Sequence, residues 1–588
     1  MEPLVIPKQS VPSSGASIGR GRLAGEIPVQ DWIIAGCLLA LMLVLKALYL
    51  HSLPWHSDEP QHMHVVWSWA TGRLPYRDVF DNHSPLFGFL FSPLFRWVGE
   101  RDDIVDAMRW FMLPLFTLSL FCLYQMGRIA VSKRAGLWAA MIGGFFPPWF
   151  LKMGEFRTDV LWTTLWLVTL LLLVSGPLTV RRLFFAGLAL GATFSVSMKT
   201  TLMLLTIGAA GGSVAALGLL FPAARFAGGS AAAWAARVGA ALGGVLLIPA
   251  AFVSFFAAKG IFRQMYYCVI QHNLNGGHSA GRIYRHFLSP YSLLIPLALG
   301  LGWMILRSSR TESGRAMRAV FLLCVTALFC PILEGVWTSV TPQDYMPLWP
   351  LAGGLAAVAL LTLCGKVPLV RETRRIVEGV LLLAILGGEA AYAIHSHAPL
   401  GPRNVYGVAL IKEARALTEP NEYLMDPKGE TVYRPRPYWY VLETLTRKRL
   451  YDGDLYDELP QTLIDTKTAV VLPSKRMMEG SLKFIDQNYV QIGMLHVLGK
   501  IVAPTEAGDY SFAITIPERY TLVTRQGDRA SGDLDGSPFT EPRILTPGKH
   551  SFHTASAKGP LAVVWARATE KGFRPSFDRK ENTDAGGQ

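Results

Sequence analysis

Charged residues are scarce in this chain of 588 residues, where Asp, Glu, Lys and Arg together make up 17% of the sequence. Hydrophobic residues account for 51%, and the mean hydropathy is +0.30. This composition excludes an ordinary soluble multidomain protein and favours a membrane protein. The net charge of +13 does not indicate nucleic-acid binding, because the Lys and Arg residues lie mostly in short links between apolar runs.

Cysteine is also rare, and its placement argues against a secreted disulfide-linked protein. Six cysteines occur, five of them lie in apolar stretches, and none lies beyond residue 364. A disulfide framework is therefore not expected. The first thirty residues lack a short apolar core followed by a small-residue cleavage site. We therefore expect no removable signal peptide, and we expect the first apolar run to remain as an anchor.

Long apolar runs are present instead, and about eleven of them are long enough to cross a membrane as helices. Positive residues gather in alternate links between these runs, and such links face the cytoplasm. This pattern predicts an α-helical polytopic protein of the inner (plasma) membrane, with its N-terminus cytoplasmic and its C-terminal domain outside. The expected spans are 31–50, 108–130, 135–151, 159–175, 182–198, 200–221, 237–257, 288–306, 317–334, 344–364 and 376–395.

The polar region after residue 396 contains about 190 residues, enough for a separate extracytoplasmic domain. Its first part, 396–502, mixes a helical pattern with short strand-like runs and predicts an α/β module. Alternating segments separated by turn residues predict a β-rich, sandwich-like module over 503–576. We expect the tail 577–588 to be disordered and residues 1–30 to form a cytoplasmic segment.

Two acidic clusters lie at span ends that topology brings to the same outer face. The pair Asp58-Glu59 opens the first outer loop, 51–107, while Glu155 and Asp159 lie between the third and fourth spans. A carboxylate beside the hydrocarbon layer loses hydration, which raises its basicity and suits a general base. The alternative is that these residues cap helices and have no chemical role. For the second cluster the two interpretations are compatible.

The order of these motifs resembles that of the membrane glycosyltransferases of the GT-C superfamily, especially bacterial relatives of lipid A aminoarabinose transferases and protein O-mannosyltransferases. The resemblance covers residues 31–395, which would form the transmembrane catalytic domain. Many relatives have Lys where this chain has His83, and neutral His is a poorer phosphate partner. The matching segments are Asp58-Glu59, Tyr76-Arg77-Asp78 to His83-Ser84-Pro85-Leu86, Asp159 at the fourth span, and Gln343-Asp344-Tyr345-Met346-Pro347-Leu348-Trp349-Pro350.

This resemblance implies transfer of a sugar from a polyprenyl-phosphate donor to a lipid, glycan or protein acceptor on the extracytoplasmic side. Asp58 would be the general base, and Glu59 would share or orient that role. The departing phosphate regains negative charge, so cations or hydrogen-bond donors must stabilise it. The implied acceptor- or sugar-binding residues are Glu155, Asp159, Tyr76 and Tyr345, and the implied donor-phosphate residues are His83, Arg157, Arg282 and Arg285.

Several of these polar residues also have simpler interpretations. Arg282 and Arg285 could instead contact lipid headgroups. Lys199, near a span end, is expected to extend its ammonium group to the membrane surface and is assigned no catalytic role. The histidines of residues 56–64 and Asp58 are ligand types that suit a divalent metal, but they form no tight ligand motif. We therefore assign no metal ligands and no certain cofactor, and leave a divalent metal open.

Two other classes of function compete with the enzyme. A membrane lipid or solute transporter or flippase would carry charged residues or broken helices near the middle of the bilayer. Here the ionisable residues gather at span ends, although Gly-rich spans and Pro147-Pro148 leave transport open. A receptor-like anchor for an external binding domain would need far fewer than eleven spans. The sequence therefore favours interfacial chemistry.

Overall fold

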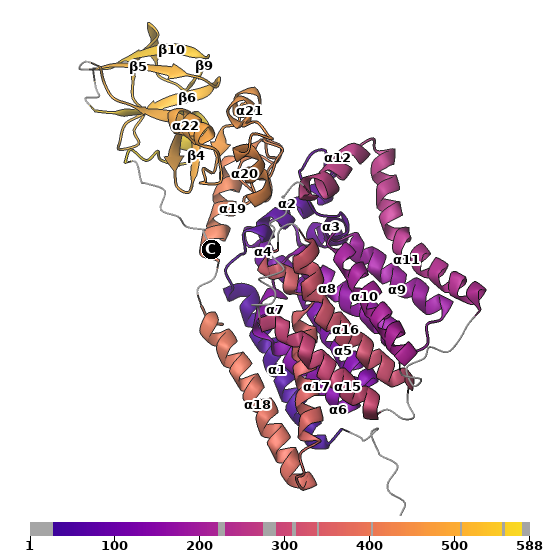
Figure 1. Ribbon diagram of the computed structural model, residues 1–588. Coiled ribbons are helices and arrows are strands. Elements are labelled where there is room, and N and C mark those ends of the chain that lie inside the picture. Colours follow the sequence, from indigo (N-terminus) through magenta and orange to yellow (C-terminus); the bar gives the residue numbers. More distant parts are fainter. Residues whose placement is uncertain are drawn as a thin grey trace, which may run out of the picture.

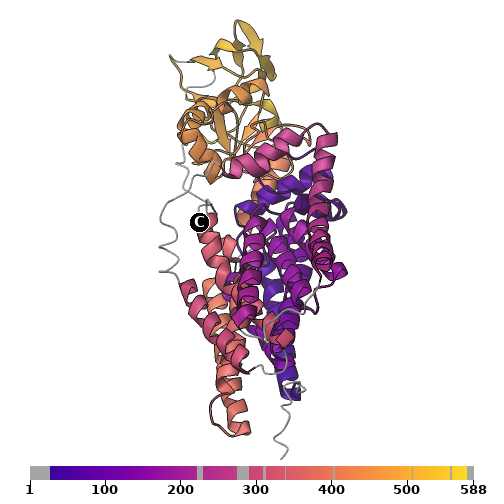
Figure 2. The same cartoon turned by 45° about the vertical axis from the view of Figure 1, so that its right-hand side comes forward.

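The computed structural model describes residues 27–220, 230–274, 290–308, 313–337, 340–401, 404–505, 508–555 and 559–578. A bundle of long helices carries a smaller region of strands and short helices at one end (Figures 1 and 2). Arg282 and Arg285 lie outside the described residues, as do almost all of the expected N-terminal segment and C-terminal tail.

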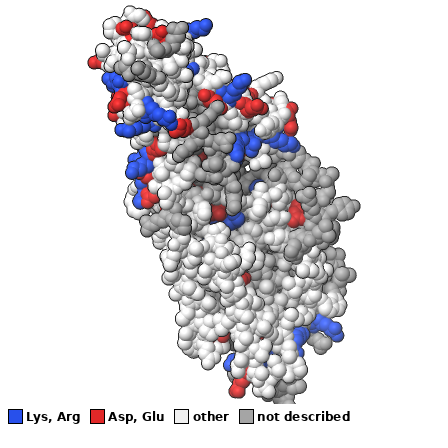
Figure 3. Space-filling model, turned by 90° about the vertical axis from the view of Figure 1, so that its left-hand side faces the viewer, with Lys and Arg blue, Asp and Glu red and all other residues white. Residues whose placement is uncertain are grey.

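The helices of the bundle follow the apolar runs of the sequence, and each expected span overlaps at least one helix. Side chains on much of the bundle surface in Figure 3 are uncharged, and charged residues gather toward its two ends and on the smaller region. The helices are α1 (Val29–Ser52), α5 (Leu113–Ala130), α6 (Lys133–Phe145), α7 (Pro147–Lys152), α8 (Thr158–Val174), α9 (Val180–Phe194), α10 (Thr200–Leu220), α11 (Ala231–Ala258), α15 (Leu294–Ser308), α16 (Ser313–Val336), α17 (Trp349–Cys364) and α18 (Arg371–Ser396).

Within the described residues, six helices are long and apolar enough to cross a membrane, and four shorter apolar helices accompany them. The polytopic membrane architecture expected from the sequence is therefore confirmed, while the count of about eleven spans stays a prediction. The six are Val29–Ser52, Ile104–Ala130, Thr200–Leu217, Ala231–Ala258, Gly314–Val336 and Arg371–Ser396.

The expected span 135–151 is two helices, α6 and α7, with a break at Phe146. Pro147 disfavours a helical conformation for the residue before it, and Phe146 accordingly has φ −51° and ψ 111°. Close packing of α6 on α17 depends on small residues, because a Cβ atom on Gly143 would lie 2.6 Å from the carbonyl oxygen of Pro350. These features hold α7 at the end of the bundle nearest the smaller region (Figure 1).

The expected outer loop 51–107 is largely helical. Its helix α3 is apolar, with phenylalanine at four of its 13 positions, and packs against α2. A second helical segment follows α11 and lies at the end of the bundle where α2 and α3 also lie (Figure 1). The elements are α2 (Asp58–Ala70), α3 (Leu86–Val98), α4 (Ile104–Arg109), the short 3₁₀ helix η1 (Trp110–Met112), α12 (Phe262–Tyr266), the π-helical turn η3 (Tyr267–Gln271), α13 (His272–Leu274), η4 (Pro290–Leu293) and η5 (Pro342–Tyr345).

The C-terminal region contains two sheets and five helices within its described residues. A seven-stranded sheet has the order β1-β2-β4-β11-β6-β9, with β3 paired to β4, and a second sheet has the order β5-β10-β7-β8. The first sheet takes strands from both sides of residue 502, so the two modules expected there share one sheet and one apolar core. The helices are α19 (Val405–Leu417), α20 (Thr444–Tyr451), α21 (Leu459–Asp465), α22 (Glu479–Asn488) and α23 (Ala566–Glu570); the strands are β1 (Leu424–Met425), β2 (Val470–Val471), β3 (Tyr489–Ile492), β4 (Leu495–Val502), β5 (Asp509–Ile514), β6 (Glu518–Val523), β7 (Gly532–Leu534), β8 (Ser537–Phe539), β9 (Arg543–Leu545), β10 (Gly548–His553) and β11 (Leu561–Trp565).

Candidate active site

Asp58 lies in the first turn of α2, at the end of the bundle that faces the C-terminal region. Its Oδ2 is 2.9 Å from Nη2 of Arg157, and its Oδ1 accepts a hydrogen bond from the ammonium group of Lys428. The side chain keeps 28% of its surface exposed, whereas those of Arg157 and Lys428 keep 7% and 4%. The carboxylate is therefore held by two buried cations and remains open to a ligand.

Arg157 joins the two acidic clusters that the sequence places 100 residues apart. Its guanidinium lies 2.9 Å from Asp58, 3.0 Å from Asp159 and 3.3 Å from Glu155. The residue directly precedes α8 in an extended conformation, which turns its side chain toward α2. The Ser57 side chain makes no capping hydrogen bond at the start of α2. Asp58 and Asp159 lie in the first turns of α2 and α8, where a negative charge is favourable beside the helix N-terminus, so the helix-end interpretation and the site interpretation stay compatible.

The electrostatic environment of Asp58 differs from the one expected at a membrane surface. Burial alone would raise the pKa of Asp58, but Arg157, Lys428 and His56 together hold it well below its ordinary value. The expectation of a raised basicity is therefore wrong for this arrangement, because nearby cations outweigh desolvation. Burial, with a further contribution from Arg157, lowers the pKa of His56 to about 4, so its ring is neutral at pH 7.

Glu59, the neighbour of Asp58, is fully buried and has partners for both carboxylate oxygens. Nε and Nη2 of Arg109 donate to it at 2.7 and 2.6 Å, and the backbone N–H groups of Phe156 and His56 donate at 2.7 and 2.8 Å. Arg109 also donates to the backbone carbonyls of residues 50, 53 and 54 at the end of α1. Glu59 thus connects α1, α2, α4 and the chain before α8, which positions Asp58 beside Arg157.

A second ion pair, between Lys199 and Asp344, lies close to the pair of Asp58 and Arg157. The sequence did not predict it. Lys199, expected only to reach the membrane surface, pairs with the fully buried Asp344. Asp344 also accepts hydrogen bonds from the backbone N–H and hydroxyl of Thr341 at 2.8 and 3.1 Å. Next to it, the Tyr345 hydroxyl donates to Glu334 at 2.6 Å, and the Tyr345 ring stacks on Tyr291 with centroids 5.0 Å apart.

The segment around His83 is tied to the same surface of α2. The His83 ring lies against the ring of His62 with centroids 4.7 Å apart, and its Nδ1 is 3.1 Å from Asp81. Tyr76 is fully buried and donates its hydroxyl to the His83 carbonyl at 2.8 Å. Tyr76 therefore shapes this segment. Burial lowers the pKa of His62, and the charges of His83, Asp58 and Lys428 also act on it.

Lys428 is the site residue that sequence reasoning could least have found. It belongs to the C-terminal region and reaches Asp58 across 370 positions of the chain. The turn pattern Asp426-Pro427-Lys428-Gly429 predicts only a loop, and nothing in it indicates a distant partner.

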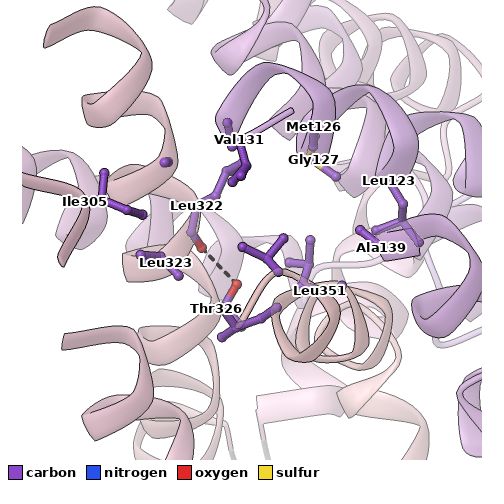
Figure 4. Close-up of a pocket in the computed structure, with 15 residues that line it drawn as sticks. Leu123, Met126, Gly127, Val131, Ala139, Ile305, Leu322, Leu323, Thr326 and Leu351 are labelled. Carbon is purple, nitrogen blue, oxygen red and sulfur yellow. Dashed lines mark hydrogen bonds between the residues drawn. The ribbon is translucent and has the colours of Figure 1, made fainter. Parts of the chain in front are cut away.

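A cavity lies elsewhere in the bundle, between α5, α6, α15, α16 and α17. It has a volume of about 80 Å³ and is lined almost entirely by apolar side chains such as Leu123, Leu322 and Leu351 (Figure 4). The Thr326 hydroxyl donates to the Leu322 carbonyl within its own helix, so it offers the cavity little polarity. This cavity lacks the charged groups of the candidate site.

The described residues contain no group of three or more His, Cys, Asp or Glu side chains placed to hold a metal ion. The histidines near Asp58 point to different partners. His64 binds the carbonyl oxygen of Val432 through Nδ1 at 2.7 Å, His62 packs on His83, and Nε2 of His56 lies 3.2 Å from the side-chain nitrogen of Gln343.

No family model matches this sequence, and no curated protein matches it. Solved structures do match its fold. ArnT from Cupriavidus metallidurans bound to undecaprenyl phosphate is 14% identical, with a TM-score of 0.53 over 80% of this chain and 98% of that chain. The same enzyme in the apo state gives 14% identity and a TM-score of 0.50 over the same shares. The archaeal oligosaccharyltransferase AglB from Archaeoglobus fulgidus, in complex with an inhibitory peptide and a dolichol-phosphate, is 11% identical, with a TM-score of 0.42 over 85% of this chain and 74% of that chain.

The match extends over nearly the whole length of ArnT. The chain therefore has the fold of the GT-C membrane glycosyltransferases, as the sequence resemblance predicted.

Proposed function

We propose that this protein is an integral membrane glycosyltransferase, which transfers a sugar from a polyprenyl-phosphate donor to an acceptor on the extracytoplasmic side. The observation that carries the proposal is the partly exposed Asp58 carboxylate, held between the buried cations Arg157 and Lys428 at one end of an apolar bundle. The fold supports it, since ArnT has the same fold and has been seen with undecaprenyl phosphate bound.

Sugar transfer from a phosphate carrier needs two kinds of group in one place. A base must take the proton of the acceptor hydroxyl as it attacks the anomeric carbon, and cations must stabilise the phosphate as its bond to the sugar breaks. A carboxylate and two cations meet at Asp58, next to apolar helices that could receive a lipid chain. We assign the base to Asp58 and the phosphate-stabilising charge to Arg157, with His83 nearby.

The other predicted residues fit supporting roles. Glu59 positions Asp58, because both of its oxygens are occupied and its side chain is fully buried. Glu155 and Asp159 orient Arg157, and each retains the capacity to accept from sugar hydroxyls. Tyr345, whose ring stacks on Tyr291 and whose hydroxyl donates to Glu334, keeps the acceptor- or sugar-binding role that the sequence resemblance implies. The roles of Arg282 and Arg285 toward the donor phosphate stay predictions.

The location and the acceptor complete the proposal. We assign the Asp58 end of the bundle to the extracytoplasmic side of the inner (plasma) membrane, and the alternation of positive links in the sequence supports this orientation. The acceptor is a lipid, a glycan or a protein, and the sugar is a hexose or a pentose.

The test is sugar transfer by purified protein in membrane lipid, using a panel of radiolabelled polyprenyl-phosphate sugars. We expect the wild type to consume at least one donor, and Asp58→Asn to lower turnover by about 10²–10⁴-fold, the usual contribution of a general base. Asp528→Asn is the matched control, because it makes the same chemical change at an exposed turn of the β-rich region.

Folding of each variant should be checked by its thermal unfolding midpoint, since Asp58→Asn leaves Arg157 and Lys428 without a shared carboxylate. Equal turnover by a folded Asp58→Asn variant would remove Asp58 from the role of base. If no donor is turned over and reconstituted vesicles show flux of a lipid or solute, the protein is a transporter and not a glycosyltransferase.

A further inference from the structure

One segment of the C-terminal region, residues 426–436, reaches the candidate site and is rigidly built. Asp426 is fully buried and accepts hydrogen bonds from the backbone N–H groups of Gly429 and Thr431 at 2.5 and 2.8 Å and from the Thr431 hydroxyl at 2.6 Å. The Arg436 guanidinium lies 3.2 Å from Asp426 and donates to its backbone carbonyl at 2.9 Å. These contacts within the segment fix its conformation independently of its contacts with the bundle.

The 426–436 segment is docked tightly on α2 and on the chain before α4. The Val432 carbonyl oxygen lies 2.7 Å from Nδ1 of His64, and a Cβ atom on Gly429 would lie 2.8 Å from the Cβ of His64. The Tyr433 hydroxyl accepts from the backbone N–H of Arg101 at 2.9 Å and donates to its carbonyl at 2.7 Å. Docking of this kind fixes the place at which the segment presents Lys428.

Lys428 leaves this segment toward Asp58. Its ammonium group donates to Oδ1 of Asp58 and lies 3.4 Å from the Ser57 hydroxyl, and its side chain is only 4% exposed. Burial of a lysine ammonium group costs hydration free energy, and such a buried charge is tolerated only where an anion compensates it. Among the described groups, Asp58 is the carboxylate that pairs with it.

The two cations on Asp58 are not equivalent. Arg157 is shared by Asp58, Asp159 and Glu155, so it stays neutralised if it loses one of them. Among the residues that the structure describes, Asp58 is the one carboxylate within ion-pair distance of Lys428, which is a flexible point charge whose three N–H donors can be redirected. An incoming anion would therefore compete with Asp58 for Lys428 more readily than for Arg157.

We propose that Lys428 is a phosphate-binding residue supplied by the C-terminal region, which exchanges Asp58 for the phosphate of the donor lipid. This inference rests on the proposed function and extends it, because it makes the C-terminal region a part of the catalytic centre. Donor binding thereby activates Asp58 as a base. The donor phosphate draws Lys428 away, and Lys428 is one of the two cations that keep Asp58 weakly basic.

The acceptor hydroxyl oxygen forms a bond to the anomeric carbon while its proton passes to Asp58. The bond between the anomeric carbon and the phosphate oxygen breaks, and its electron pair stays on that oxygen. The phosphate changes from a singly charged diester to a monoester with a second negative charge, which the Lys428 ammonium stabilises.

Binding of a polyprenyl monophosphate to the full-length protein in nanodiscs of uncharged lipid tests the exchange without any need for turnover. We expect Lys428→Gln to weaken binding about tenfold or more, and Lys428→Arg to restore most of it. We expect Asp58→Asn to tighten binding severalfold, because it removes the anion that competes for Lys428. In the Lys428→Gln background, Asp58→Asn should tighten binding much less, because only the release of Arg157 and the loss of a nearby negative charge then contribute.

Lys412→Gln is the matched control, since Lys412 is an exposed lysine of α19 and should leave the affinity unchanged. The corresponding polyprenol, which lacks the phosphate, should bind with no dependence on Lys428, and inorganic phosphate should reproduce the dependence at much weaker affinity. Phosphate binding that is unaffected by Lys428→Gln, or weakened by Asp58→Asn, would overturn the exchange.

The affinity of the Asp58→Asn variant for polyprenyl phosphate tests the exchange even if Lys428→Gln fails to fold, because this variant keeps Lys428. Failure of the proposed function would look different: polyprenyl phosphate would show the expected pattern of affinities while no donor sugar is transferred. Failure of this inference alone would leave Asp58-dependent transfer with phosphate binding that is independent of Lys428.

Discussion

Replacement of Arg109 by Met should destabilise the protein more than most single substitutions, because it breaks a fully buried ion pair from one side. Arg109 and Glu59 are 1% and 0% exposed. The substitution leaves the Glu59 carboxylate with only two backbone N–H donors, and it removes the donors that satisfy the carbonyls of Leu50, Leu53 and Pro54. Removal of one partner from such a pair costs about 3–5 kcal/mol.

The double variant Glu59→Gln, Arg109→Met should recover part of this loss, since no uncompensated charge remains and the Gln oxygen can still accept from the backbone N–H of Phe156. Denaturant and thermal unfolding of purified protein in lipid nanodiscs would measure both. A cost below about 1 kcal/mol for Arg109→Met, or a double variant as unstable as the sum of the two single variants, would refute this account of the pair.

Three further outcomes are expected from the site and its docking segment. Gly429→Ala should weaken polyprenyl-phosphate binding, because residue 429 has φ +91° and its new Cβ would meet His64; unchanged affinity would show that the segment tolerates displacement. Tyr433→Phe should cost about 1–3 kcal/mol by leaving the backbone N–H and carbonyl of Arg101 unpaired, seen as faster hydrogen exchange at residues 426–436, whereas unchanged exchange would contradict the contact. The pKa of Asp58 is depressed in the folded protein, so its contribution to stability is fully present above the ordinary pKa of 3.8 and is lost as pH falls through the lower folded pKa. The difference in unfolding midpoint between wild type and Asp58→Asn should therefore stay constant from about pH 7 to pH 5. A decline in that range would contradict the assigned ion pairs.

Much of the membrane architecture could be predicted from the sequence because it depends on local composition. A long apolar run forms a helix in lipid wherever it occurs, since its backbone groups have no other partners there. The expected spans accordingly coincide with helices such as α1 and α18. The break at Phe146 has a local cause in Pro147, which the span assignment did not use. The helices within 51–107 could not be found, because they depend on packing at the end of the bundle.

The candidate site divides in the same way. The sequence identified Asp58, Glu59, Glu155 and Asp159 as acidic residues at span ends of the expected outer face, and the family resemblance added Arg157. Their partners were decided only by tertiary structure.

Two neighbouring carboxylates received different environments in the fold: Glu59 is saturated by Arg109 and backbone donors, while Asp58 remains partly open between Arg157 and Lys428. The sign of the pKa shift at Asp58 followed from those cations and not from its place in the chain. The sequence by itself determined which segments enter the membrane and which side chains can carry charge at their ends. The tertiary structure decided which charges meet, because pairs such as Asp58 with Lys428 come from segments that only the docking of the C-terminal region brings together.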